Sequence, residues 1–430
     1  MMTAMLSALS PVPAVAQGGG AVRASAVRTV TADQVALAIR SEAGGWLGRG
    51  YAERGYRPLW WSNGRIGPAA ATLIDYLNTA GQDGLKPSSY DIDDLREAIA
   101  RARDGDPRSA AKAEVALSKA FVRYVRDQRR PREVGMIWAD PSLKPKRPKA
   151  ETVLRAAFFP KSFAGYISDM GWMSPHYVRL RGLMAASPGG APAVDMTRLR
   201  LNLERARVLP GAWTRHIVVD ASSGRLWFYE AGEQAGTMKV VVGARETQTP
   251  MLAGTVQWAI VNPYWNVPTY LARKSVAPKV LAGRSLASLR MEALSDWSAD
   301  ARRLPAASID WRAIAAGTQE IRLRELPGAG NSMGKVKFLF PNDEGIYLHD
   351  TPDRALLKAD DRHLSNGCIR LESAAVLARW LMGKPLGAMP RSPEQAVALP
   401  VSVPVYLTYL TPTAGGSRIA FRPDIYGRDG

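Results

Sequence analysis

The spacing of apolar residues divides the chain into a helical first half and a strand-rich second half. Leu117, Phe121 and Val125, within residues 110–127, recur at the helical period of three to four positions. From Trp213 onward, short runs of β-branched and aromatic residues are separated by turn residues, which is typical of strands. We therefore predict an α+β fold, in which an all-helical scaffold precedes a mostly β barrel or sandwich.

Local signals mark where these elements begin. Thr31 is expected to cap a first helix running to about Arg40, Pro68 to open another and Asp91 to cap a third. Trp60 and Trp61 lie in an aromatic stretch that we assign to core packing. The predicted strands are 216–220, 225–229, 238–242, 256–262, 336–340, 346–349 and 403–410, and the first two form a hairpin around 222–224.

Composition shifts suggest the following division of the chain. Residues 1–16 resemble a secretory signal peptide with an Ala-Val-Ala cleavage site, although the positive first region is missing. The other predicted segments are a disordered stretch over 17–30, the scaffold over 31–198, the β domain over 199–411 and a C-terminal tail over 412–430. Within the β domain the strand pattern lapses into helical pieces between about 266 and 334, and an insertion of that length is typical of a lid.

The chain is strongly basic, with 57 Lys and Arg against 39 Asp and Glu and a net charge of +18. This charge favours an anionic partner such as nucleic acid, a membrane surface or a cell-wall polymer. The sequence carries no helix-turn-helix, zinc or RNA-binding signature, so nucleic acid is not expected. After the N-terminal segment it also has no apolar run long enough to span a bilayer.

Candidate chemistry is concentrated between His349 and Arg370. Cys368 is the only cysteine of the chain and follows Gly367, while His349 precedes it by 19 positions. A lone thiol with a nearby histidine is a candidate nucleophile and base. The run 345–348 reads as a strand with Tyr347 and His349 on one face, and a helix over 372–382, capped by Ser373, should favour the thiolate by its dipole.

Each of these residues also has a structural interpretation. Cysteine is often buried and inert. His363 is a rival base, which we place in a loop, and His176 and His216 are assigned to a loop and to a strand surface. Asp350 could orient His349, and its backbone carbonyl is the more plausible contact because adjacent strand side chains point to opposite faces.

The stretch resembles the YkuD-like L,D-transpeptidase signature: a His, about fifteen residues, then Ser/Thr-His-Gly-Cys, an aliphatic residue and Asn or Arg. The matching positions here are His349, Ser365, Gly367, Cys368, Ile369 and Arg370, and Asn366 replaces the second His. Further similar stretches are residues 200–205, 249–250, 262–268 and 56–61. The resemblance is to the Gram-negative branch with a helical N-terminal region, without the peptidoglycan-binding module that this branch often carries.

The resemblance implies a periplasmic peptidoglycan L,D-transpeptidase that is acylated by carbapenems and needs no metal or cofactor. Its partners would be donor and acceptor stem peptides, and a monomer is favoured. Cys368 would be the nucleophile, with His349 as base and Asp350 orienting the imidazole. Gly367, Asn366 and Ser365 would form the oxyanion loop, whereas Arg370, Tyr347, Trp265 and Tyr264 would contact substrate.

Three alternatives stay open. The cross-link could be 3–3, between diaminopimelates, or 1–3, between L-Ala and diaminopimelate. The same acyl-enzyme could instead serve an L,D-carboxypeptidase or the anchoring of a protein. A catalytically inactive cell-wall-binding scaffold, with Cys368 buried, belongs to a different class of function.

Overall fold

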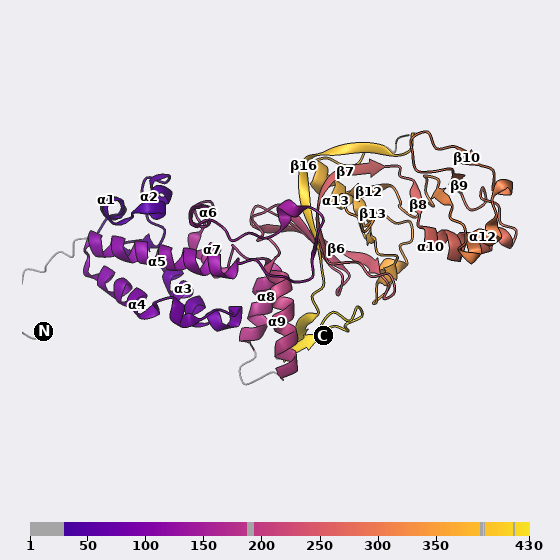
Figure 1. Ribbon diagram of the computed structural model, residues 1–430. Coiled ribbons are helices and arrows are strands. Elements are labelled where there is room, and N and C mark those ends of the chain that lie inside the picture. Colours follow the sequence, from indigo (N-terminus) through magenta and orange to yellow (C-terminus); the bar gives the residue numbers. More distant parts are fainter. Residues whose placement is uncertain (1–29, 187–192, 388–389, 391, 416–417) are drawn as a thin grey trace, which may run out of the picture.

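The computed structural model describes residues 30–186, 193–387, 390, 392–415 and 418–430. The predicted signal peptide and nearly all of the stretch 17–30 lie outside these residues. The helical scaffold lies at one end of the molecule and the main sheet in the middle (Figure 1). The inserted segment at about 266–334, predicted to be a lid and called the lid below, lies at the other end. No described helix is long and apolar enough to cross a membrane.

The scaffold helices begin at the residues that their sequence signals indicate. Thr31 forms a capping box with Gln34 at the start of α1, and Asp106 caps the long helix α5. Asp91 precedes α4 in a left-handed conformation and makes no side-chain cap, contrary to expectation. The helices are α1 Ala32–Glu42, α2 Gly45–Ala52, α3 Pro68–Asn78, α4 Ile92–Arg101, α5 Pro107–Gln128, α6 Ala150–Ala156, α7 Phe163–Ser168, α8 Pro175–Ala185 and α9 Ala193–Arg207.

The scaffold has its own hydrophobic core, in which the aromatic stretch 56–61 takes part. Trp60 is 1% exposed and packs edge-on against Phe121 of α5. Short strands β1 Trp61–Ser62 and β2 Arg65–Ile66 form a hairpin beside it. Packing rather than ligand binding therefore accounts for these tryptophans.

The second half closes into a barrel. The strand order is β12-β13-β15-β6-β5-β4-β16-β7, and β7 pairs again with β12, so the path returns to its start. These strands are β4 His216–Asp220, β5 Arg225–Glu230, β6 Glu233–Gly243, β7 Leu252–Val261, β12 Val336–Leu339, β13 Leu348–His349, β15 Ile369–Leu371 and β16 Gln395–Thr408. Helix α13, Ala374–Met382, packs into the barrel core. The expected mixture of a helical scaffold and a β-rich domain is confirmed.

Two further strands attach to this barrel. β3, Ile137–Trp138, pairs with β7 although it lies in a Pro- and Lys-rich connector between scaffold helices. β14, His363–Ser365, pairs with β6 just before the cysteine loop. His363 thus lies in a strand and not in a loop.

The lid is a small α+β unit, not only helical pieces. Its antiparallel sheet has the order β10-β9-β11-β8 and covers a separate hydrophobic core around Trp311 and Leu323. Its elements are β8 Trp265–Val267, α10 Thr269–Leu271, α11 Ala277–Leu281, β9 Met291–Leu294, β10 Arg303–Leu304, α12 Trp311–Ala316 and β11 Arg322–Glu325. The strands were missed because they are short and β11 alternates arginine with Leu323 and Glu325.

The C-terminal segment folds back onto the body of the protein. Strands β17, Pro412–Gly415, and β18, Arg418–Phe421, form a hairpin beside α8, near the marked C-terminus (Figure 1). Asp429 is 8% exposed and its carboxylate accepts hydrogen bonds from Arg205 and Asn202 of α9. These contacts explain Asn202 and Arg205 within the stretch at 200–205.

Two histidine assignments made from the sequence are wrong. His176 lies in α8 at 6% exposure, and His216 in β4 is fully buried. The His216 ring stacks on Tyr229 at 5.0 Å, and the Tyr229 hydroxyl lies 3.3 Å from His176 Nε2. Both rings therefore belong to the packing between scaffold and barrel.

Candidate active site

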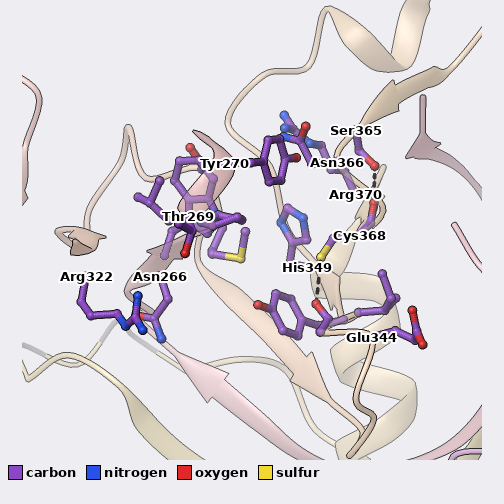
Figure 2. A pocket seen from close by; sticks show the side chains of 18 of the residues that line it. Asn266, Thr269, Tyr270, Arg322, Glu344, His349, Ser365, Asn366, Cys368 and Arg370 are labelled. Carbon is purple, nitrogen blue, oxygen red and sulfur yellow. Dashed lines mark hydrogen bonds between the residues drawn. The ribbon is translucent and has the colours of Figure 1, made fainter. Parts of the chain in front are cut away.

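A cavity of about 570 Å³ lies between the barrel and the lid. The barrel contributes Tyr347, His349, Cys368 and Arg370 to its lining, and the lid side contributes Trp265, Asn266, Tyr270, Arg322 and Met333. Figure 2 shows His349 and Cys368 in the middle of the cavity, with Tyr270 nearby and Arg322 and Asn266 on the other side.

Strand pairing brings His349 and Cys368 together. β13 and β15 run parallel, with His349 opposite Arg370, and the Ile369 amide donates to the Tyr347 carbonyl at 3.0 Å. Cys368 directly precedes β15, so the cysteine lies beside the strand that carries the histidine. The parallel pairing thus explains why residues 19 positions apart share one cavity.

The imidazole of His349 is fixed in one tautomer. Its Nδ1 lies 2.6 Å from the backbone carbonyl oxygen of Asp350. Since a carbonyl only accepts hydrogen bonds, Nδ1 carries the proton and Nε2 is left as an acceptor. Burial, with the charges of Arg370 and Lys337, lowers the pKa of His349 to about 3, so the ring is neutral at ordinary pH.

The Asp350 carboxylate points away from the imidazole. One oxygen accepts from the Lys335 amide at 2.9 Å and the other from Arg354 at 2.9 Å. Gly334 has φ +61°, and a Cβ there would lie 2.5 Å from this carboxylate. Asp350 thus contacts His349 through its main chain, the contact preferred from the sequence, while its side chain fixes the adjoining loops.

The thiol of Cys368 is neutral in the resting protein. Burial raises its pKa to about 11, opposed by the Tyr347 amide and the charge of Arg370. The sulfur lies 3.5 Å from the Gly345 carbonyl oxygen. The predicted Ser373 cap of α13 is present, and residues 369–373 separate Cys368 from that helix, so an effect of its dipole on the thiol stays a prediction.

The loop before the cysteine is held by a network of hydrogen bonds. Ser365 Oγ donates to the Cys368 carbonyl at 2.6 Å and accepts from the Gly367 amide at 3.1 Å. Thr249 Oγ1 donates to the Gly367 carbonyl at 2.7 Å. Gly367 has φ +109°, which favours glycine.

The residues predicted to form an oxyanion loop have different roles in this network. Ser365 and Gly367 bond to each other, so their role is to shape the turn. Asn366 is exposed and lines the cavity. The Cys368 amide has no hydrogen bond to any residue that the structure describes, and it is the remaining donor next to the sulfur.

Three of the four residues predicted to contact substrate line the cavity, and one does not. Tyr347, Trp265 and Arg370 line the cavity. Arg370 makes no ion pair with a described residue, and its buried Nε has no hydrogen-bond partner there, which disfavours the structural salt bridge. Tyr264 does not line the cavity: its ring lies 4.0 Å from the Arg324 guanidinium.

His363, the rival base, finds no support in the site. His363 Nδ1 lies 2.5 Å from Asp361 Oδ1, and His363 does not line the cavity. Within the described part of the chain, no three His, Cys, Asp or Glu residues are grouped to hold a metal ion.

Sequence reasoning missed several residues of the site. Asn266 and Thr249 lay within stretches noted for their resemblance, but neither had been given a role. Tyr270 and Arg322 come from the lid, and nothing in their local sequence indicated that they would reach the cavity.

Comparison with known proteins gives two family matches. Residues 45–184 match the scaffold domain, and residues 214–403 match the YkuD L,D-transpeptidase catalytic domain. Over 395 residues the chain is 27% identical to a Haemophilus influenzae protein provisionally assigned as an L,D-transpeptidase, covering 89% of this chain and 78% of that protein.

Solved structures of L,D-transpeptidases are more distant. The Mycobacterium smegmatis enzyme gives a TM-score of 0.22 at 13% identity, over 45% of this chain and 58% of that chain. L,D-transpeptidase 3 of Mycobacterium tuberculosis, in complex with a faropenem-derived adduct, gives 0.23 at 14% identity, over 45% and 60%. The chain therefore spans little more than half the length of these structures, and such low scores add nothing to the assignment. The chain thus contains a YkuD L,D-transpeptidase catalytic domain behind a scaffold domain.

Proposed function

We propose that the protein is a periplasmic cysteine L,D-transpeptidase that cross-links peptidoglycan stem peptides through an acyl-enzyme. One observation carries this proposal: the Cys368 thiol and the His349 imidazole line one cavity, and a carbonyl fixes the imidazole with Nε2 as acceptor. Such a pair can transfer a proton at the moment of attack, which is how a general base activates a nucleophile for acyl transfer.

In the first step the Cys368 sulfur attacks the carbonyl carbon of an L-centre residue whose next neighbour is a D-residue. The thiol proton passes to His349 Nε2 as the carbon–sulfur bond forms. The carbonyl oxygen becomes an oxyanion, and the Cys368 amide is the donor that we assign to it. When the intermediate collapses, the carbon–nitrogen bond breaks and the leaving amine takes the proton from His349.

In the second step the amine of an acceptor stem peptide attacks the thioester. His349 accepts a proton from this amine, a new amide bond forms as the carbon–sulfur bond breaks, and the proton returns from His349 to the sulfur. Arg370, with no ion pair among the described residues, is placed to bind a carboxylate of the substrate. The lid wall, which includes Trp265 and Tyr270, would exclude water and favour the amine over hydrolysis.

The inactive-scaffold alternative predicts a cysteine shut off from solvent. Cys368 is instead only partly buried and lines the cavity beside His349, which supports an enzyme. The 3–3 cross-link, the 1–3 cross-link, hydrolysis and protein anchoring would all use the same acyl-enzyme.

The test is incubation of the purified protein with uncross-linked sacculi, followed by digestion and mass spectrometry of the muropeptides. New dimers are expected, and their fragmentation identifies the 3–3 or 1–3 bond. Cys368→Ala and His349→Gln should form none. A covalent carbapenem adduct on Cys368, implied by the family resemblance, checks the nucleophile separately. If only trimmed monomers accumulate, the carboxypeptidase alternative replaces cross-linking.

A further inference from the structure

A second and larger cavity, of about 1020 Å³, lies between the scaffold and the barrel. Its scaffold wall comes from residues 159–179, and its barrel wall comes from Ala212, Trp213 and the β5–β6 turn. None of its lining residues belongs to the active-site cavity.

Two aromatic rings stand exposed at this cavity. Trp213 is 43% exposed and Phe159 is 72% exposed, and large aromatic side chains usually bury far more of their surface. Exposed rings that line a hollow mark a binding site more often than rings scattered over a surface.

The Trp213 ring is held in place rather than free. The Gly232 amide donates to the Ala212 carbonyl at 3.1 Å, which fastens the β5–β6 turn to the segment before Trp213. A Cβ on Gly232, whose φ is +91°, would lie 2.8 Å from the indole, so the turn packs against the ring. Tyr166 makes an edge contact at 6.5 Å. The indole is therefore an ordered platform.

The charges around these rings balance. The cavity is lined by two basic residues, Lys161 and Arg179, and by two acidic residues, Asp169 and Glu233. The side chains of Lys161, Asp169 and Glu233 are exposed and make no hydrogen bond or ion pair with other described residues. An apolar helix in this cavity would leave these polar groups unpaired, and a strongly anionic ligand would meet two carboxylates.

A neutral, polyhydroxylated ligand fits both features. The C–H face of a sugar ring can pack on an indole, while its hydroxyl groups bond to surrounding charged side chains. We propose that this cleft binds the glycan strand of peptidoglycan. This inference rests on the proposed function, since it takes the substrate peptides to be carried on glycan.

The distance between this cleft and the Cys368 thiol limits the role that a glycan bound in the cleft can have. β6 begins at Glu233, in the cleft, and ends at Gly243, which pairs with Ser365 of the cysteine loop. Eleven residues of strand span about 35 Å, whereas a five-residue stem peptide reaches about 17 Å. The sugar in the cleft is thus not the one whose peptide reacts, and the cleft holds the polymer while another stem reaches Cys368.

The experiment titrates neutral N-acetylglucosamine oligomers, which are peptide-free chains without carboxylates, into the full-length Cys368→Ala protein in a calorimeter. Trp213→Ala should weaken binding about tenfold, and Phe159→Ala should weaken it as well. Trp258→Ala is the matched control, because Trp258 has the same exposure of 43% on β7 and lies in neither cavity. In the active protein, Trp213→Ala should raise KM for sacculi, with kcat and carbapenem acylation unchanged.

Absence of binding by peptide-free chains, or an equal loss in Trp258→Ala, overturns the proposal. A rise in KM for isolated stem peptides would also overturn it, since these have no glycan. If Trp213→Ala fails to fold, Phe159→Ala and Asp169→Asn replace it, with glycan affinity and KM for sacculi as the two measurements. Glycan binding without acylation or cross-linking would refute the proposed function alone, and cross-linking without glycan binding would refute the cleft alone.

Discussion

At the scale of single residues, the active site depends on two groups that burial keeps neutral. The pKa of His349 is lowered to about 3 and that of Cys368 is raised to about 11. In the wide range between these values, the thiol is protonated and the imidazole can accept its proton. The resting site therefore holds a neutral thiol and a neutral imidazole, unlike cysteine proteases in which a thiolate is preformed.

This pairing predicts the pH dependence of acylation by a carbapenem. The second-order rate constant should stay nearly constant from about pH 5 to pH 9 and should fall only as His349 gains a proton in stronger acid. In His349→Gln the rate should drop about 10²–10⁴-fold. In this variant the rate constant should increase about tenfold for each unit that the pH is raised, because only the thiolate reacts. Stopped-flow absorbance gives both profiles, and an inflection near pH 6–7 in the wild type would instead indicate a preformed ion pair.

Gly367 shows how far one backbone angle determines the site. At φ +109° an alanine is strained, and its Cβ would lie 3.1 Å from Ile346 Cδ1. We expect Gly367→Ala to lower the free energy of unfolding by about 1–2 kcal/mol and to slow acylation at least tenfold, because the Cys368 amide shifts. Denaturant unfolding and acylation kinetics measure the two effects.

Gly383→Ala is the control for this substitution. Gly383 has φ +69° at the end of α13, and nothing lies within 4 Å of its virtual Cβ. The control should lose stability to a similar degree and react at the wild-type rate. Equal slowing in both variants would show that general destabilisation, rather than the cysteine loop, controls reactivity.

At the scale of elements, the C-terminal segment supports the cysteine loop from behind. The Tyr426 hydroxyl donates to the Gly243 carbonyl at 2.6 Å and accepts from the Thr249 amide at 3.3 Å. Thr249 in turn accepts from the Gly243 amide and donates to the Gly367 carbonyl. The chain of contacts runs from residue 426 through the end of β6 to the residue before the nucleophile.

Removing one hydroxyl tests this support. Tyr426→Phe leaves the Gly243 carbonyl without its donor, so we expect a loss of about 1–3 kcal/mol in stability and a several-fold slower acylation. Tyr56→Phe in the scaffold is the control, since the Tyr56 hydroxyl has no hydrogen bond to a described residue. Wild-type acylation by Tyr426→Phe would mean that the tail contributes stability alone.

The elements that could be predicted from the sequence are those determined by residues close together in the chain. The 3.6-residue period identified the scaffold helices, the β4–β5 hairpin follows from its turn, and the lone cysteine with its histidine marked the cavity. The lid sheet, strand β3 and the docking of the C-terminal segment depend on partners far away in the sequence. His176 and His216 look polar in isolation, and only the packing between scaffold and barrel buries them.

At the scale of the whole molecule, three buried histidines link stability to pH. Burial lowers the pKa of His176 to about 3, of His216 to about 4 and of His349 to about 3. In the unfolded chain each returns to about 6.5. Unfolding below pH 6.5 therefore takes up protons, so the stability that these rings contribute is present above the unfolded pKa and is lost as the pH falls.

Each such histidine should add about 1.4 kcal/mol per pH unit to the slope of stability against pH, between about pH 4.5 and pH 6. Buried carboxyls with raised pKa values, Glu114 and Asp220, oppose this slope. A difference between variants is therefore the cleaner measurement. His176→Gln and His349→Gln should each reduce the slope by about one proton, although the two lie in different parts of the fold. Urea midpoints over a pH series give these slopes. If either variant keeps the wild-type slope, that histidine is protonated in the folded protein and its burial does not hold it neutral.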